Sequence, residues 1–266
     1  MTELEQNLNE ILNEKKGKII PENIREGIEI FGIQGLAKLL DEKEYEENVN
    51  ICKRILGRNG GPILKDLVCY YYGNDLIDKT GSGKDGSLEG NYITTDASCI
   101  EFNGGKAKTG EINSARGTFE VYCNIPTTFT PANASAWYSC SCIFGWETGA
   151  EHQDFGIIID ASGNFAVGYS MHAIASTNVK ANDGQNHHLV LIIEDNVLKF
   201  YIDNVIKATI TYSMTGNIAT TYGLFWNNEV TTTVTKGKLY AFRYYNRSLT
   251  ESEIEYNYQC CVDNIY

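Results

Sequence analysis

From about residue 67 onward, short apolar stretches alternate with small polar clusters. In several stretches every second residue is apolar, and Asn, Asp and Gly fill the gaps, which is typical of strands joined by tight turns. Short strands at this regular spacing predict an antiparallel β-sandwich. We expect strands in LVCYYYG, SCIEFNG, GTFEVYCNI, SCIFGW, FGIIID, FAVGYS, HHLVLIIE, VLKFYID, VIKATITY, YGLFWN and KLYAFRYYN.

Residues 1–66 show helical spacing instead. Thr2 and Glu5 form a T-x-x-E capping box, and a second amphipathic helix is predicted at residues 41–56, before the linker GRNGGP. Helices with one narrow apolar stripe bury little surface by themselves. Two interpretations therefore stand equal: a cap on the β domain, or an attachment and oligomerisation segment in residues 1–40. The residues that would make attachment contacts are Leu4, Leu8, Ile11, Leu12, Ile20, Ile24, Ile28, Ile30, Phe31 and Ile33.

This division sets three predicted parts: an attachment segment in residues 1–40, a helix and linker in residues 41–66, and the sandwich in residues 67–266. Ile28, Ile30 and Ile33, separated by glycines, predict a short strand or turn pair within the first part. All three Trp residues lie beyond residue 66. The composition thus changes where the predicted fold changes.

Overall composition limits the partners. With 42 % hydrophobic and 21 % charged residues, the chain can bury a large core. Its net charge of −12 offers no basic face, so we expect neither a nucleic-acid partner nor docking on an anionic membrane. No apolar run approaches the roughly twenty residues that span a bilayer. The first residues lack the order of a signal peptide, so we expect synthesis in the cytoplasm.

The eight cysteines show no C-x-x-C spacing, and Cys260 and Cys261 are adjacent. Without a signal peptide, reduced and mostly buried thiols are expected. Cys140, Cys142 and His152 lie near one another in the sequence, but they lack the paired ligand clusters of a structural zinc site. We therefore expect no metal and no cofactor.

Two adjacent histidines open the stretch NHHLVLIIEDNVLKFYIDNVI, Asn186–Ile206. The turns EDN and DN within it predict a three-strand meander. Both faces of its first strand are apolar, which predicts a central strand covered on both sides. His187 and His188 would then point to opposite faces, so one metal could not easily bind both. We expect structural histidines, one hydrogen-bonded to a loop backbone and the other packed at the strand start.

The chain carries no sequence signature of catalysis. Retaining glycoside hydrolases need two carboxylates about 5 Å apart. Here Glu151 and Asp154 fall in a predicted loop, and Glu194 and Asp195 fall in a predicted turn. The pattern favours a protein that is not an enzyme, since an enzyme would have to assemble its acids from separate strands.

Sugar binding needs an exposed aromatic ring with amide and acid neighbours. The stretches GWETGAEHQD and FWNNE both supply this combination and could form rim sites for glycan. The alternative is that both tryptophans belong to the core, where large aromatic residues are common. The candidate ligand-binding residues are Trp146, Glu147, Gln153, Trp226, Asn227 and Asn228.

Four motifs follow one another in the β part: DKTGSGKDGSLEGN, SCIEFNGG, DGQNHHLVLIIEDNVLKFYIDNVI and GKLYAFRYYNRSLTESEIEYNY. Together they resemble laminin-G-like, concanavalin-A-like sandwiches over about residues 67–260, although Asn186 and Asn204 replace the family's Trp and Gly. The resemblance implies a jelly-roll sandwich and structural roles for Arg243 and Glu253. Ser248 or Thr250 would cap a helix at residues 251–258, with Glu253 completing a T-x-x-E box.

Some laminin-G-like domains bind calcium at the rim of the sandwich. The loop acids Asp78, Asp85, Asp160 and Asp183 fit no calcium motif of that family. We expect each to be a solvated turn residue, so a rim calcium ion has no support in the sequence.

The stretch GKIIPENIREGIEIFGIQGLA, residues 17–37, resembles a segment of structural proteins from phages of Gram-positive bacteria, often near tail or fibre components. The two resemblances together imply a non-catalytic virion structural protein made in the host cytoplasm. Residues 1–40 would contact other virion proteins or sister subunits in a homo-oligomer such as a trimer. The sandwich would bind a cell-surface or environmental glycan, or decorate the particle. A bacterial lectin or adhesin and a polysaccharide-processing enzyme are the alternatives.

Overall fold

The computed structural model describes residues 61–147, 154–170, 172–212, 220–226 and 235–264, and the backbone of residues 29–30 and 33–34. The chain divides into two compact units, residues 1–60 and residues 61–266. In the first unit, β1 (Glu29–Ile30) pairs antiparallel with β2 (Ile33–Gln34), which confirms the predicted strand pair. The two predicted helices lie outside the described residues, as do the attachment residues Leu4, Leu8, Ile11, Leu12, Ile20, Ile24, Ile28 and Phe31.

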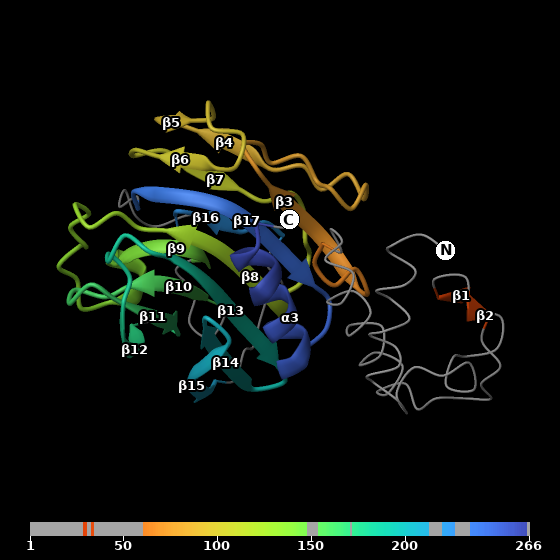
Figure 1. Ribbon diagram of the computed structural model, residues 1–266. Helices are drawn as coiled ribbons and strands as arrows, with labels where there is room; N and C mark the ends of the chain where they lie inside the picture. The colour runs from red at the N-terminus through yellow and green to blue at the C-terminus, as the bar shows by residue number, and fades with distance from the viewer. Residues whose placement is uncertain are drawn as a thin grey trace. The chain divides into compact units, whose positions relative to one another are not determined.

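Two antiparallel sheets make up the second unit (Figure 1). The seven-stranded sheet has the order β12 (Ala173–Lys180), β11 (Asn164–Tyr169), β10 (Phe155–Ile159), β9 (Ser141–Trp146), β16 (Gly223–Leu224), β7 (Lys106–Lys108) and β4 (Ser87–Glu89). The eight-stranded sheet has the order β15 (Val205–Thr211), β14 (Val197–Ile202), β13 (Asn186–Glu194), β8 (Gly117–Asn124), β17 (Gly237–Tyr245), β6 (Ile100–Phe102) and β5 (Tyr92–Ile93), and β3 (Leu67–Tyr72) pairs with β17. The predicted mainly β sandwich is confirmed.

Strand β13 shows how the alternating pattern builds the core. Leu189, Leu191 and Ile193 pack between the two sheets, whereas Val190 and Ile192 pack on the opposite face of their own sheet. Strands β8 and β14 flank β13, and every residue from 187 to 193 is buried. The prediction of a central strand covered on both sides is therefore confirmed.

Tight turns join β13, β14 and β15 into the predicted meander. The turn between β14 and β15 places Asp203 at φ 50° and Asn204 at φ 62°. Two successive positive φ values define the turn type that matches strand twist, and Asp and Asn tolerate this conformation better than most residues. Asn204 thus adopts a positive φ at the position where the laminin-G-like pattern has Gly.

The β unit begins at Gly61, before the predicted boundary at residue 67. Ile63 is buried, and its backbone N–H donates to Asn257 Oδ1 at 2.9 Å. The Ile63 carbonyl accepts from the Tyr245 hydroxyl at 2.9 Å. These long-range bonds fix the entering chain to the end of the sequence.

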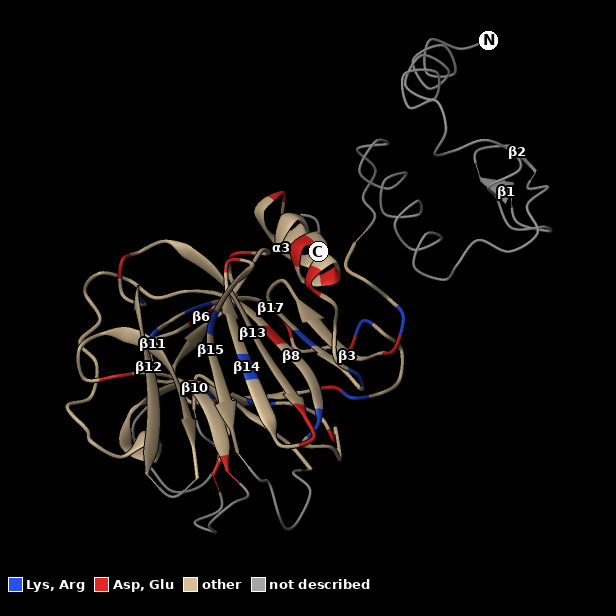
Figure 2. Cartoon of the chain, turned by 90° about the horizontal axis from the view of Figure 1, so that it is seen from below, with Lys and Arg blue, Asp and Glu red and all other residues tan. Residues whose placement is uncertain are grey.

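Helix α3 (Glu251–Val262) lies on the outer face of the eight-stranded sheet, where Ile254 joins Val190 in one buried cluster. Figure 2 shows acidic residues along α3 and few charged residues on the strands. The Thr250 hydroxyl accepts from the Glu253 N–H, and the Glu253 carboxylate accepts from the Thr250 N–H at 2.8 Å. The predicted capping box is confirmed at Thr250, and the helix runs past the predicted residue 258.

The outer face of the seven-stranded sheet is partly covered by the segment before β9. Gly145 lies opposite Gly156, and Gly156 lies opposite Gly168, so three adjacent strands present no side chain at this level. Trp137 is fully buried and packs closely over these glycines. A Cβ at Gly168 would lie only 2.5 Å from the Trp137 Cβ, so the glycine is what makes room for this side chain. The Trp137 indole N–H donates to the Ser170 carbonyl. The chain itself therefore occupies this part of the face.

Candidate functional site

The tryptophans of the predicted sugar sites are both buried, each with an exposed fraction of 7 %. Trp146 ends β9 and packs in the core between the sheets. Trp226 follows β16, and the Lys106 ammonium lies 3.9 Å from the centre of its ring, so one ring face is already in contact with the chain. Gly145 lies opposite Gly223 in the antiparallel pair β9–β16, which places the two tryptophans toward opposite ends of the sheet.

The predicted neighbours of these tryptophans add little to either site. Glu147 is buried beside Trp146 in the sequence. Gln153, Asn227 and Asn228 lie outside the described residues. The structure does not bring the two tryptophans together, and the role of the six residues in binding stays a prediction.

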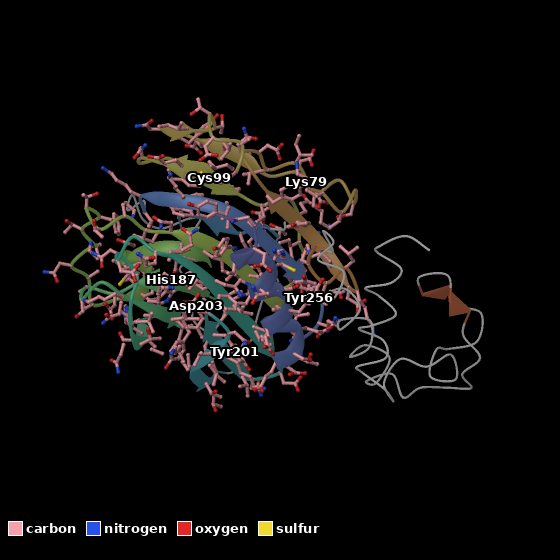
Figure 3. The ribbon with its side chains drawn as sticks, viewed as in Figure 1. Lys79, Cys99, His187, Tyr201, Asp203 and Tyr256 are labelled. Atoms are coloured by element: carbon pink, nitrogen blue, oxygen red, sulfur yellow. The ribbon has the colours of Figure 1, made fainter. Side chains whose placement is uncertain are left out.

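Charged side chains meet instead at the start of β13, where Figure 3 labels His187 and Asp203. His187 Nδ1 lies 2.7 Å from Asp203 Oδ2, and its Nε2 lies 3.3 Å from both carboxylate oxygens of Asp183. Asp203 Oδ1 also accepts the backbone N–H of His188 at 2.9 Å. A loop-backbone partner is predicted for one of the two histidines, and the partners of the His187 ring are instead carboxylates that two turns bring to this end of the sheet.

Burial of His187 opposes its charged form, but Asp203 and then Asp183 favour that form more strongly. The pKa of His187 is therefore raised above its ordinary value. Each ring nitrogen of His187 already faces a carboxylate, so this arrangement forms an ion-paired clasp. The clasp joins the loop before β13 to the turn after β14.

His188 points to the opposite face, as predicted, and joins a buried charged cluster beneath α3. Glu120 Oε2 accepts from the Arg243 guanidinium at 3.1 Å, and both oxygens of Glu120 accept from Asn257 Nδ2 at 3.1 Å. His188 Nε2 lies 3.5 Å from Glu120 Oε1, and the His188 ring stacks on Tyr258 with 6.1 Å between centroids.

Glu120 is held ionised in this cluster. Burial raises the pKa of Glu120, but His188, Arg243 and Asn257 together lower it by a larger amount. The pKa of Glu120 therefore lies below its ordinary value. A catalytic acid that works near neutral pH needs a raised pKa. The cluster is therefore suited to joining α3 to the sheet, which agrees with the structural role expected for Arg243.

The loop acids Asp78 and Asp160 are buried, so the expectation of solvated turn residues is wrong for both. Asp78 accepts from the backbone N–H groups of Tyr70 and Lys84, at 3.1 and 3.2 Å, and Asp160 accepts from two N–H groups of its own turn. Such bonds order a turn from within. Among the residues that the structure describes, no group of three or more His, Cys, Asp or Glu could hold a metal ion.

All seven cysteines in the described ranges are buried, as expected for them, and none of these seven forms a disulfide. The eighth, Cys52, lies outside those ranges. Burial raises the pKa of Cys140 and of Cys261 to about 11. Neither thiol is therefore a thiolate nucleophile near neutral pH.

Residues 101–255 match the family model described as the Concanavalin A-like lectin/glucanases superfamily. This match spans more than half of the 266 residues, and the chain belongs to that superfamily. No curated protein matches the chain in sequence. In the described part of the chain, no helix is long and apolar enough to cross a membrane.

Solved structures share the fold at low sequence identity. Domain 4 of AbnA, an extracellular arabinanase from Geobacillus stearothermophilus, in complex with arabinotriose, is 20 % identical with a TM-score of 0.55, over 71 % of this chain and 97 % of that domain. Trypanosoma rangeli sialidase in complex with 2,3-difluorosialic acid is 18 % identical with a TM-score of 0.61, over 80 % of this chain and 36 % of the sialidase. The binding domain of botulinum neurotoxin DC in complex with SialylT is 13 % identical with a TM-score of 0.55, over 75 % of this chain and 52 % of that domain. The chain thus spans about a third of the sialidase and about half of the neurotoxin domain.

Proposed function

We propose that this protein is a non-catalytic structural protein of a phage virion, whose sandwich binds glycans of the host surface or the environment. The observation that carries the binding half is the membership of residues 101–255 in the Concanavalin A-like lectin/glucanases superfamily. Two structures of similar fold, AbnA domain 4 with arabinotriose and the neurotoxin domain with SialylT, support binding as a use of this fold.

The pairing of buried carboxylates supports a role without catalysis. Arg243 holds Glu120, and Arg247 holds Glu253 at 2.6 Å. The pKa of both carboxylates is lowered although burial acts to raise it, because their hydrogen-bonded and charged partners prevail. A glycoside hydrolase needs one carboxyl group that stays protonated to act as the acid. These two carboxylates are ill suited to that role.

The attachment half of the proposal concerns residues 1–40, which would contact other virion proteins or sister subunits in a homo-oligomer. These residues belong to a compact unit of their own, residues 1–60. An isolated two-stranded hairpin such as β1–β2 is marginally stable at best in water. Apolar residues of such a small unit are normally buried in an assembly, so a partner would stabilise it.

Binding of the purified full chain to immobilised polysaccharides and to cell walls of Gram-positive bacteria tests the first half. We expect saturable binding without release of reducing sugars. Turnover of any polysaccharide would make the chain an enzyme, and binding to none would refute the glycan-binding role.

Antibody labelling of purified phage particles, viewed by electron microscopy, tests the second half. We expect regularly spaced label on the particle. Absence of the chain from particles, combined with retained glycan binding, would favour a bacterial lectin or adhesin.

A further inference from the structure

Within the described residues, helix α3 covers only part of the outer face of the eight-stranded sheet. The helix packs on Val190, Ile192 and Tyr201, and Cys261 near its end packs with Ala241 and Tyr122. The rest of this face lies toward the starts of β13 and β17. On the seven-stranded sheet, Trp137 covers the glycine track and Lys106 covers the ring of Trp226.

Strand register defines a row of aromatic residues at the edge of the part that α3 covers. Tyr72 is 38 % exposed and Tyr240 is half-buried, whereas Tyr122 is buried and packs with Cys261 of α3. Tyr72 of β3 lies opposite Ala241 of β17, which lies opposite Tyr122 of β8, which lies opposite His188 of β13. Tyr240 occupies the irregular position beside Ala241, and its ring centroid lies 5.4 Å from that of Tyr122. We name Tyr72, Tyr122 and Tyr240 the aromatic row.

A second row, next to the first, is polar. Glu101 of β6 lies opposite Lys238 of β17, which lies opposite Asn124 of β8, which lies opposite Asn186 of β13. Asn124 Nδ2 donates to Asn186 Oδ1 at 3.1 Å and to the Gly184 carbonyl at 2.7 Å, which fixes the Asn124 amide. Asn186 is exposed, and the other three are half-buried. We name Glu101, Lys238, Asn124 and Asn186 the polar row.

An aromatic row beside an amide-bearing row has the chemistry of a sugar-binding surface. A sugar ring packs its C–H groups on an aromatic face and forms hydrogen bonds from its hydroxyls to amide and charged groups. Adjacent strands lie about 4.8 Å apart, so the polar row, which crosses three inter-strand gaps, extends about 14 Å, and the aromatic row, which crosses two, extends about 10 Å. Those lengths suit a short oligosaccharide better than a single sugar.

The charges in this region favour a neutral glycan. Glu101 and Lys238 lie directly opposite each other, so the polar row carries one charge of each sign. Asp203 beside it is paired with His187. The whole chain has a net charge of −12, which repels polyanions.

We propose that the aromatic row and the polar row together bind a neutral oligosaccharide. This inference rests on the proposed glycan-binding function and assigns that function to a surface distinct from the two buried tryptophans.

The test compares four variants of the full chain: Tyr240→Ala and Asn186→Ala in the rows, and Tyr138→Ala and Asn196→Ala as matched controls. Tyr138 is a half-buried tyrosine that packs on the outer face of the other sheet. Asn196 is an exposed asparagine in the turn at the opposite end of β13. The probes are arabinotriose, cellohexaose, xylohexaose and mannohexaose as neutral sugars, and sialyllactose as an anionic sugar, with dissociation constants from calorimetry.

We expect at least one neutral probe to bind, each row variant to weaken it by about tenfold or more, and each control to stay within about twofold. Asn186→Ala keeps the test decisive if Tyr240→Ala lowers the melting temperature, because Asn186 is exposed. Neutral-sugar binding that neither row variant changes would overturn the site and leave the proposed function standing. Binding of sialyllactose alone would overturn the neutral assignment. If the parent chain binds none of the probes, the proposed site is overturned for these sugars. Saturable binding to cell walls in the separate experiment would still support the proposed function.

Discussion

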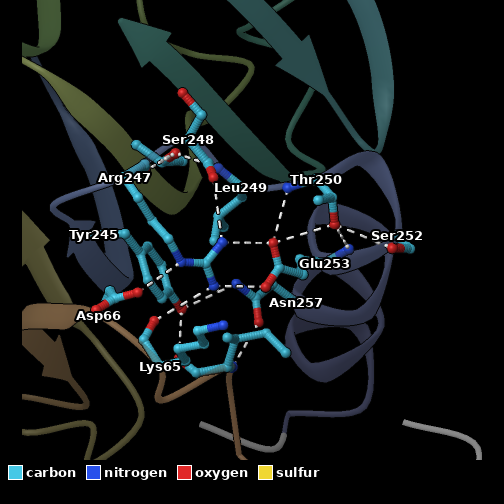
Figure 4. Close-up of polar contacts among 12 residues, drawn as sticks. Lys65, Asp66, Tyr245, Arg247, Ser248, Leu249, Thr250, Ser252, Glu253 and Asn257 are labelled. Atoms are coloured by element: carbon cyan, nitrogen blue, oxygen red, sulfur yellow. Dashed lines mark hydrogen bonds and ion pairs between the residues drawn. The ribbon is translucent and has the colours of Figure 1, made fainter. Parts of the chain in front are cut away.

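Replacing Glu253 by alanine tests how the closing segment stabilises the sandwich. Glu253 accepts from the Arg247 guanidinium at 2.6 and 2.8 Å, and from the Thr250 backbone N–H at 2.8 Å (Figure 4). Arg247 also bonds Asp66 Oδ2 at 3.1 Å, so this group ties the start of the β unit to α3. The variant would leave the Arg247 guanidinium and the Thr250 N–H without these partners.

The magnitude follows from two contributions. Loss of a helix-capping interaction costs about 1 kcal/mol. Exposed ion pairs contribute up to about 1 kcal/mol, and removing one partner of a fully buried pair costs about 3–5 kcal/mol. The side chains of Glu253 and Arg247 are 6 % and 24 % exposed, which places this bidentate pair between the two cases. We therefore expect Glu253→Ala to lower the free energy of unfolding by about 2–3 kcal/mol.

The same contacts predict a pH dependence. Burial raises the pKa of Glu253, but Arg247 and Thr250 lower it more, so the folded pKa lies below the unfolded value. The stabilisation is then fully present above the unfolded pKa of about 4.3. It is lost as the pH falls through the folded pKa. The difference between the parent chain and the variant should therefore shrink below about pH 4.

Urea unfolding followed by tryptophan fluorescence measures these differences, because all three tryptophans lie in the β unit. The matched control is Glu255→Ala, an exposed glutamate on the same helix, which should change stability by less than about 0.5 kcal/mol. Equal losses for the two variants at pH 7, or a Glu253 effect that persists unchanged at acidic pH, would refute the reasoning.

Three further predictions concern other parts of the chain. Arg243→Met should cost about 3–5 kcal/mol in urea unfolding because it leaves Glu120 buried without its cation, and adding Glu120→Gln should restore part of the loss. The raised pKa of His187 means that its stabilisation is fully present below the unfolded pKa of about 6.5 and is lost as the pH rises through the folded pKa. His187→Gln should therefore cost more stability at pH 5.5 than at pH 8.5, and the reverse order would contradict the assignment. A chain that starts at Gly61 should stay folded by circular dichroism but elute as a monomer and fail to join particles, and its continued assembly would exclude residues 1–40 as the attachment segment.

Features that depend on neighbouring residues could be predicted from the sequence. The meander of β13, β14 and β15 follows from alternation and from the turns that contain Asp195 and Asp203. The capping box follows from Thr250 and Glu253, three residues apart. Strand β12 escaped prediction because its sequence, AIASTNVK, is short of large apolar residues, as an edge strand can be. The short strands β4, β5 and β7 offer too few residues for a periodic signal.

Features that depend on distant partners could not be predicted. Glu120 interrupts the apolar stretch GTFEVYCN, which signals a buried charge, but its partner Arg243 lies 123 positions away. The carboxylate partners of His187 come from two separate turns, at Asp183 and Asp203. The buried position of Trp137 depends on the Gly156–Gly168 pairing of two strands that follow it. None of these contacts has a periodicity that a local pattern could reveal.

The surface formed by the aromatic row and the polar row also depends on residues that are distant in the sequence. Tyr122 and Asn124 stand two residues apart on β8, so alternation places both on one face. Their neighbours, Lys238 and Asn186, come from strands on either side, and only the pairing register brings them level with Asn124. Since a one-residue slip in register would turn the side chains of a strand to the other face, the surface depends on the buried residues that hold the register. Aromatic residues in loops mark the connections between strands, whereas this surface lies on the strands themselves.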